Sequence, residues 1–198
     1  MHKDIPSLKD VKVHPFIKAH WDEIAPFHKK LFESVAVPLY KLIAIMLELP
    51  EDYFVSRNQY EKRSEDWLRY ILLTLSVVLP SNNRWMLHPP RPREYYDAVE
   101  KYQIGGHTDQ SSLTLLFEQN VAGLQMLTND GTWKWVKPVK GGITINAGEL
   151  FVHLTKGFVK ATIHRVHAPV DDQLGSERLG CIYFSLLNVV PFVRSGLD

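Results

Sequence analysis

The second half of the chain is a close succession of short apolar runs separated by turn residues, and this pattern restricts the fold more than any other feature. Residues 112–117 and 121–127 are rich in strand-forming side chains. Asn129-Asp130-Gly131 follows them and is a strong hairpin-turn signal. Many short strands at regular spacing indicate a β-sandwich or barrel. Further strands are predicted at 132–136, 143–146, 161–169 and 178–187. Glycines at 141–142 precede the second of these, and a turn is predicted at 147–149.

The first third of the chain has the spacing of a helix with one apolar face. Apolar side chains recur at helical intervals from residue 24 to residue 47. Pro38 interrupts this pattern, so we expect a kink or two helices there. We expect a further short helix from Pro50, which would hold Tyr53 and Phe54 against the core. This part is therefore predicted to be a structural helical layer.

The length of 198 residues is enough for one domain with a substantial core, and we expect residues 1–198 to form a single domain. Within it, residues 14–69 are assigned to the helical layer and 99–188 to the β core. Residues 70–94 between them are irregular, with an apolar run that leads into Pro89-Pro90-Arg91-Pro92, and prolines mark loops.

Composition excludes several classes of protein. The formal net charge of +1 gives no field that would attract nucleic acid or an anionic membrane. Cys181 is the only cysteine, which rules out an internal disulfide. The N-terminus lacks the apolar core of a signal peptide, and the longest apolar run, 71–79, is shorter than the about 20 residues that span a bilayer. We therefore expect a soluble, cytoplasmic protein without nucleic-acid or membrane partners.

His107 and Asp109 are the first candidate metal ligands. In an extended chain, residues two apart point the same way, so both side chains can bind one metal ion. Two histidines and one carboxylate are the ligand set of mononuclear non-haem Fe(II) oxygenases. The third ligand must come from a distant part of the chain, and the residues alone leave the choice open. The candidates are His153, His164 and His167.

Several motifs occur together in an order and at a spacing that resemble one enzyme family. The first is Gly106-His107-Thr108-Asp109, and a His-Arg-Val motif begins at His164. The remaining motifs are residues 113–117, 123–125, 146–149, 155–157 and 178–180, with Phe184. The chain resembles the iron- and 2-oxoglutarate-dependent dioxygenases of the isopenicillin N synthase-like superfamily. The resemblance is close over residues 99–188 and looser over the helical part.

This resemblance implies a fold and a site. The fold is mainly β with flanking α-helices, a double-stranded β-helix or jelly roll, which this short chain would leave incomplete. His107, Asp109 and His164 would bind Fe(II), with no catalytic residue beyond these ligands. Arg178 would bind the distal carboxylate of the co-substrate 2-oxoglutarate, since a planar guanidinium matches a carboxylate better than lysine does.

The implied activity is the oxidation of a small organic molecule. In this family O2 and 2-oxoglutarate hydroxylate or desaturate the substrate, with release of succinate and CO2. We expect a role in specialised metabolism. Leu116, Phe117 and Phe184 have the character of substrate-pocket residues, and equally of core residues.

The chain departs from the family pattern at three places. Gly180 stands where the family has serine, so one hydrogen bond to the co-substrate carboxylate, worth about 1.5–3 kcal/mol, is missing. His88 stands roughly where the family has a tyrosine, and residues 71–85 look like an insertion into one strand. Missing sheet strands would expose edges, so we expect lower stability or an oligomer.

Other classes of protein share parts of this pattern. The main alternative is a catalytically impaired, truncated relative that acts as a metal- or ligand-binding protein. A nucleic-acid demethylase of the same chemistry would need a basic stripe to grip a phosphate backbone, and the chain has none. A cupin-like zinc or manganese protein would need no arginine after the last ligand, so Arg178 argues against it.

Overall fold

The structure, a computed structural model, describes residues 15–58, 60, 67–71, 86–88, 91–98 and 102–187. These residues fall into two compact units. One holds the helical residues up to 60 together with 186 and 187, and the other holds those from 67 to 185. The expected single domain and its internal boundaries stay predictions.

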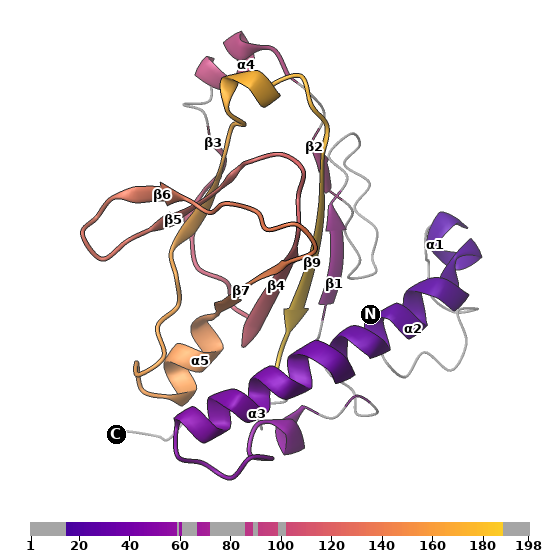
Figure 1. Cartoon of the computed structure of the whole chain (residues 1–198), viewed down its shortest axis with the longest axis vertical. Helices are drawn as coiled ribbons and strands as arrows, with labels where there is room; N and C mark the ends of the chain where they lie inside the picture. Colours follow the sequence, from indigo (N-terminus) through magenta and orange to yellow (C-terminus); the bar gives the residue numbers. More distant parts are fainter. Residues whose placement is uncertain are drawn as a thin grey trace, which may run out of the picture. The chain divides into compact units, whose positions relative to one another are not determined.

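The first unit is helical (Figure 1). Pro38 comes just after a π-helical turn, whose last bond runs from the amide of Val37 to the carbonyl of Phe32. The backbone of Ala36 and Val37 is helical, so the irregularity near Pro38 is a π-helical turn within a continuous helical segment, not a break between two separate helices. Phe54 is buried, and its ring lies 6.4 Å from that of Tyr40. The elements are α1 (Pro15–Ala19), α2 (Trp21–Leu31), η2 (Phe32–Ala36), α3 (Val37–Met46) and the 3-10 turn η3 (Val55–Arg57).

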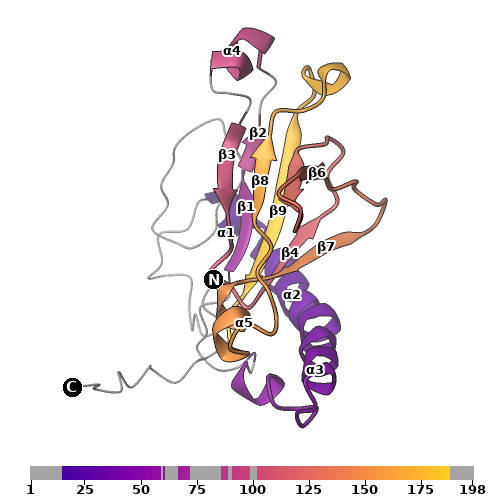
Figure 2. The same cartoon turned by 90° about the vertical axis from the view of Figure 1, so that its left-hand side faces the viewer.

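The second unit consists of two antiparallel sheets and forms a jelly roll (Figures 1 and 2). In one sheet the described strands run in the order β1-β9-β4-β7, with β2 also paired to β9, and in the other they run β3-β8-β5-β6. The predicted class, mainly β with helices, is confirmed. The strands are β1 (Trp67–Ile71), β2 (Met86–His88), β3 (Tyr102–His107), β4 (Leu113–Phe117), β5 (Leu124–Leu127), β6 (Trp133–Trp135), β7 (Ile143–Ala147), β8 (His164–His167) and β9 (Arg178–Ser185).

Register decides which side chains of the first sheet face the second sheet. Thr114 of β4 is level with Asn146 of β7 and Phe184 of β9, so these three residues share one face. Leu115 and Tyr183 are level with each other on the opposite face, and both are fully buried. The alternation that the sequence predicts in these strands is therefore present.

The strands β1 and β2 pair with successive parts of β9. Ile71 and Met86 are both level with Gly180, and His88 is level with Arg178. Residues 67–71 and 86–88 thus follow one line along β9. The segment between them, where we expect an insertion, lies outside the described residues.

One predicted turn is wrong. Residues 147–149 were expected to form a turn between strands, but Gly148 is the N-cap of α5 (Glu149–Leu154). The amide of Gly148 donates to the carbonyl of Ser112, and that of Glu149 to the carbonyl of Asp109. The first N–H groups of the helix are therefore satisfied by a distant loop, which no local pattern indicates.

The short helices of this unit lie at its two ends. α4 (Arg93–Ala98) and α5 are at opposite ends of the sheets in both views (Figures 1 and 2). The β5–β6 hairpin turns through Gly131 at φ +79°, as predicted, and projects from the side of the unit (Figure 1). In the described parts of the chain, no helix is long and apolar enough to cross a membrane.

Candidate metal centre

The pairing of β3 with β8 brings two histidines together. His107 is the last residue of β3, His164 is the first residue of β8, and the two are partners in the antiparallel ladder. Two register shifts in β3, between Tyr102 and Ile104 and between Ile104 and His107, adjust this pairing. Such bulges redirect side chains near functional sites. Without them, the regular ladder would place a different residue opposite His107.

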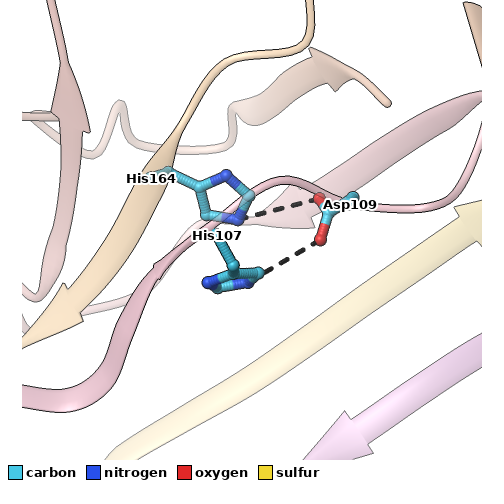
Figure 3. A group of neighbouring side chains, drawn as sticks. All are labelled: His107, Asp109 and His164. Atoms are coloured by element: carbon cyan, nitrogen blue, oxygen red, sulfur yellow. Dashed lines mark ion pairs between the residues drawn. The ribbon is translucent and has the colours of Figure 1, made fainter. Parts of the chain in front are cut away.

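His107, Asp109 and His164 form one cluster, which we call the metal cluster (Figure 3). One ligand atom from each residue lies within 4.8 Å of the others. His107 Nε2 is 3.9 Å from Asp109 Oδ1, and His164 Nε2 is 3.7 Å from Asp109 Oδ2. The two imidazole rings lie 4.4 Å apart between centroids. These side chains converge on one point, as ligands of a single ion do.

Backbone carbonyls fix the tautomer of both histidines. His107 Nδ1 lies 2.9 Å from the carbonyl oxygen of Gly105, and His164 Nδ1 lies 3.0 Å from that of Thr162. A carbonyl oxygen can only accept, so Nδ1 carries the hydrogen in each ring. Both Nε2 atoms therefore present a lone pair towards Asp109, which is the arrangement of metal-binding histidines.

The carboxylate of Asp109 is held from two sides. Asn146 of β7 donates through Nδ2 to Asp109 Oδ2 at 2.9 Å. The amide of Glu149 at the start of α5 donates to the Asp109 carbonyl at 2.7 Å. A Cβ atom at Gly148 would lie 2.7 Å from that same carbonyl, so only glycine allows this approach. The motif at residues 146–149 thus positions the carboxylate.

The metal cluster is open on the His107 side. The side chain of His107 is 39% exposed, whereas those of Asp109 and His164 are 8% and 15% exposed. Three protein ligands would occupy one face of a bound ion, and the accessible opposite face would leave coordination positions for further ligands. A two-histidine, one-carboxylate set with open positions fits Fe(II).

Arg178 is buried without an acidic partner among the described residues. It is 2% exposed, and its Nη2 donates to Gln103 Oε1 at 2.6 Å. Its Nε is buried and finds no hydrogen-bond partner in the described part of the chain. Burial lowers the pKa of Arg178 to about 10, with a smaller opposing effect from Tyr96. A buried guanidinium with an unsatisfied N–H fits an anionic ligand.

Arg178 lies on the face of β9 that looks towards the metal cluster. Residues alternate along a strand, so Arg178 and Phe184 share a face. Phe184 is level with Asn146, whose side chain contacts Asp109. The guanidinium occupies space that Gly123 leaves, because a Cβ there would overlap Arg178 Nη1. We call Arg178, Gln103, Tyr96 and Gly123 the arginine cluster.

The other candidate histidines lie elsewhere. His153 is exposed on α5 rather than on a strand. His167 lies on β8 with its ring against those of Tyr102 and Trp135. Among the described residues, the structure therefore brings His164, and neither of these two, to His107 and Asp109.

Leu116 and Phe117 line a cavity of about 80 Å³ between β4, β5 and β7. Ligand pockets measure roughly 300–1,000 Å³, so this cavity is too small for an organic substrate. A larger cavity of about 510 Å³ is lined by residues such as Tyr96, Trp135 and His167, but by none of the metal cluster. Phe184 lines neither cavity.

Three supporting residues make contacts that sequence reasoning did not predict. Asn146 and Gly123 belong to the resemblance motifs, but their contacts with Asp109 and Arg178 follow only from sheet register. Gln103 lies 75 residues from Arg178 in the chain. It would draw attention only as a polar side chain in a strand, shortly before the glycine pair that leads to His107.

The comparisons with known proteins agree with this geometry. A 2-oxoglutarate-Fe(II) type oxidoreductase of Aspergillus fumigatus is 35% identical over 102 residues, which is 51% of this chain and 28% of that protein. Gibberellin 2-beta-dioxygenase 7 of Arabidopsis thaliana is 32% identical over 111 residues, which is 54% of this chain and 30% of that protein. The chain thus spans less than a third of the length of either relative.

A solved structure shows the same fold. A Neurospora crassa protein, in complex with alpha-KG and thymine, superposes with a TM-score of 0.71 at 20% identity, covering 88% of this chain and 48% of that one. Residues 88–185 match the model of the 2OG-Fe(II) oxygenase superfamily. This match includes every residue of the metal cluster and of the arginine cluster. The chain belongs to the 2OG-Fe(II) oxygenase superfamily, which uses Fe(II) and 2-oxoglutarate.

Proposed function

We propose that this chain carries the active site of an Fe(II)- and 2-oxoglutarate-dependent oxygenase that oxidises a small organic molecule. In a hydroxylation, one atom of O2 enters a C–H bond of the substrate and the other enters succinate, while 2-oxoglutarate loses CO2. The single observation that carries the proposal is the convergence of His107, Asp109 and His164 within 4.8 Å. Both histidines present Nε2 to the common point.

In this proposal the metal cluster holds the iron and Arg178 holds the co-substrate. The ion supplies two-electron oxidation with O2 when it is bound. His107 and His164 contribute neutral nitrogen donors and Asp109 contributes a negative charge, which suits a divalent cation. Arg178 offers its unpaired Nε hydrogen to the distal carboxylate of 2-oxoglutarate. No further residue of the chain is assigned a catalytic role.

The substrate is proposed to be a small molecule of specialised metabolism. The Arabidopsis relative bears the name of a gibberellin dioxygenase, and the chain has a formal net charge of only +1. That charge does not favour binding to a phosphate backbone. Ile182 and Phe184 share a strand face with Arg178 and would keep water from the reacting region.

The test is turnover of 2-oxoglutarate. The protein is loaded with Fe(II) in the absence of oxygen, 2-oxoglutarate is added, oxygen is admitted, and succinate is measured. Slow succinate formation without a prime substrate is expected. His107→Ala should remove iron binding, and Arg178→Ala should remove 2-oxoglutarate binding. A protein that binds neither iron nor 2-oxoglutarate would overturn the proposal.

A second candidate is a metal- or ligand-binding protein without turnover. The observation that favours it is Gly180. This residue lies two positions after Arg178 on β9, opposite Ile71 of β1 and Met86 of β2, and it offers no side chain to a carboxylate. Iron and 2-oxoglutarate binding without any succinate, even after a screen of small substrates, would support this candidate over the oxygenase.

A further inference from the structure

Gln103 is the polar side chain that contacts the guanidinium of Arg178 within the described residues. Its Oε1 accepts from Arg178 Nη2 at 2.6 Å, which is a short hydrogen bond. The glycines at positions 123 and 180 offer no side chain to the same group. The orientation of this guanidinium therefore depends on a residue of the opposite sheet.

The amide of Gln103 has one possible orientation. A guanidinium only donates hydrogen bonds, so the carbonyl oxygen Oε1 must face Arg178. The amide nitrogen then points the other way and donates to the hydroxyl of Tyr96 on α4 at 3.4 Å. Tyr96 is 3% exposed. A buried phenol thus fixes the amide, and the amide fixes the guanidinium.

The hydroxyl hydrogen of Tyr96 remains available. Its oxygen accepts from Gln103, and among the described residues no acceptor is found for its hydrogen. The phenol is close enough to Arg178 to raise its pKa slightly, against the larger lowering by burial. Tyr96 and Arg178 therefore offer two donors, an O–H and an N–H, and no carboxylate forms an ion pair with Arg178 among the described residues.

We propose that Gln103, held by Tyr96, is the positioning residue for Arg178 and makes the site selective for 2-oxo acids that carry a second carboxylate. This inference rests on the proposed function. Gln103 holds Nη2 and thereby directs the remaining N–H groups towards the distal carboxylate. A neutral amide is required here, because a carboxylate at position 103 would neutralise Arg178 and compete with the ligand.

The test compares two 2-oxo acids that differ in the distal carboxylate. Binding of 2-oxoglutarate and of pyruvate to the Fe(II)-loaded protein is measured by calorimetry without oxygen. Gln103→Leu should weaken 2-oxoglutarate about 10- to 100-fold, which is the value of a hydrogen bond to a charged group, and leave pyruvate unchanged. Tyr96→Phe should weaken 2-oxoglutarate about 2- to 10-fold, as the loss of a neutral hydrogen bond does.

Gln103→Glu separates positioning from a purely structural role. If Gln103 only filled space and satisfied Arg178, glutamate would serve as well and 2-oxoglutarate binding would persist. We expect instead that Gln103→Glu folds normally, binds pyruvate, and loses its preference for 2-oxoglutarate. If Gln103→Leu does not fold, Gln103→Glu and Tyr96→Phe still test whether Gln103 positions Arg178.

Gln119→Leu is the matched control. Gln119 also donates to β9, at the carbonyl of Leu179, but it does not touch the guanidinium. It should leave both affinities unchanged. Equal weakening of both acids in Gln103→Leu, or no weakening of either, would overturn the inference alone. A wild-type protein that binds neither acid would instead overturn the proposed function.

Discussion

The metal cluster and the arginine cluster are built in opposite ways. Each histidine of the metal cluster is oriented by a backbone carbonyl two residues earlier in the chain, at Gly105 and Thr162. Arg178 is oriented by Gln103, which lies 75 residues away, and by the space at Gly123. The first cluster thus depends on local geometry plus one strand pairing, whereas the second depends on contacts between the two sheets.

The two clusters also differ in how deeply their side chains are buried. The metal cluster is open at His107, but Arg178 is 2% exposed and has an unpaired N–H in the described structure. An open, neutral pair of nitrogens beside a carboxylate can exist without its ion at little cost. A buried charge without a counter-ion is costly. The arginine cluster is therefore the part of the site that a ligand would stabilise most.

The largest expected effect is loss of the carboxylate in the metal cluster. Asp109→Ala should weaken metal binding more than 100-fold, which exceeds the about 10- to 100-fold loss caused by removing a supporting residue. Mn(II) calorimetry and iron content after dialysis measure it. His153→Ala, outside the cluster on α5, is the control and should bind metal normally. Normal metal content in Asp109→Ala would remove the metal cluster from consideration.

Removal of Arg178 should separate ligand binding from folding. Arg178→Met should lower 2-oxoglutarate affinity roughly 100-fold, since a charge-assisted hydrogen bond contributes about 1.5–3 kcal/mol. The melting temperature should change little. Burial of the charge, which lowers the pKa of Arg178, disfavours the folded state, and removing this charge offsets the about 1–3 kcal/mol lost when Gln103 lacks a partner. A large fall in melting temperature would show that Arg178 is structural.

The same group gives a pH dependence with a defined sign. The pKa of Arg178 is lowered from 12.5 to about 10 in the folded protein. Between these values the unfolded chain binds more protons than the folded chain, so this group favours folding increasingly as pH rises through that window. Comparison of wild type with Arg178→Met in denaturant titrations isolates the effect, which the variant should lack.

Asn146 tests how far the metal cluster depends on support from the other sheet. Asn146→Leu removes the donor to Asp109 Oδ2 and should weaken metal binding about 10- to 100-fold. The loss should be smaller than in Asp109→Ala. Asn120→Leu changes an exposed asparagine between β4 and β5 and serves as the control. If Asn146→Leu bound metal like the wild type, local geometry alone would be sufficient for this cluster.

Gly123→Ala should affect the arginine cluster only. A methyl group in Gly123→Ala would overlap Arg178 Nη1, so the guanidinium must move, at about 1–3 kcal/mol. We expect weaker 2-oxoglutarate binding, measured by calorimetry, and unchanged metal binding. Gly175→Ala meets no atom within 4 Å and should have no effect. Weakened metal binding in Gly123→Ala would mean that the two clusters are not independent.

Much of the β unit could be predicted because its signals are local. The Asn129-Asp130-Gly131 turn and the strands around it follow from residue types and a two-residue period. The start of α5 at Glu149 could not be predicted, because its first amides bond to the loop at Asp109. A helix of six residues has too little pattern of its own to stand out.

Three features can be read from the chain alone, because each depends on neighbouring residues. They are the spacing of His107 and Asp109, the apolar alternation of the strands, and the family motifs that indicated His164 and Arg178. Which histidine meets His107 is a property of the folded protein, since the register of β3 with β8 is a long-range pairing adjusted by bulges. The same holds for the contacts of Gln103 with Arg178 and with Tyr96, because contacts between elements far apart in the chain have no local signal.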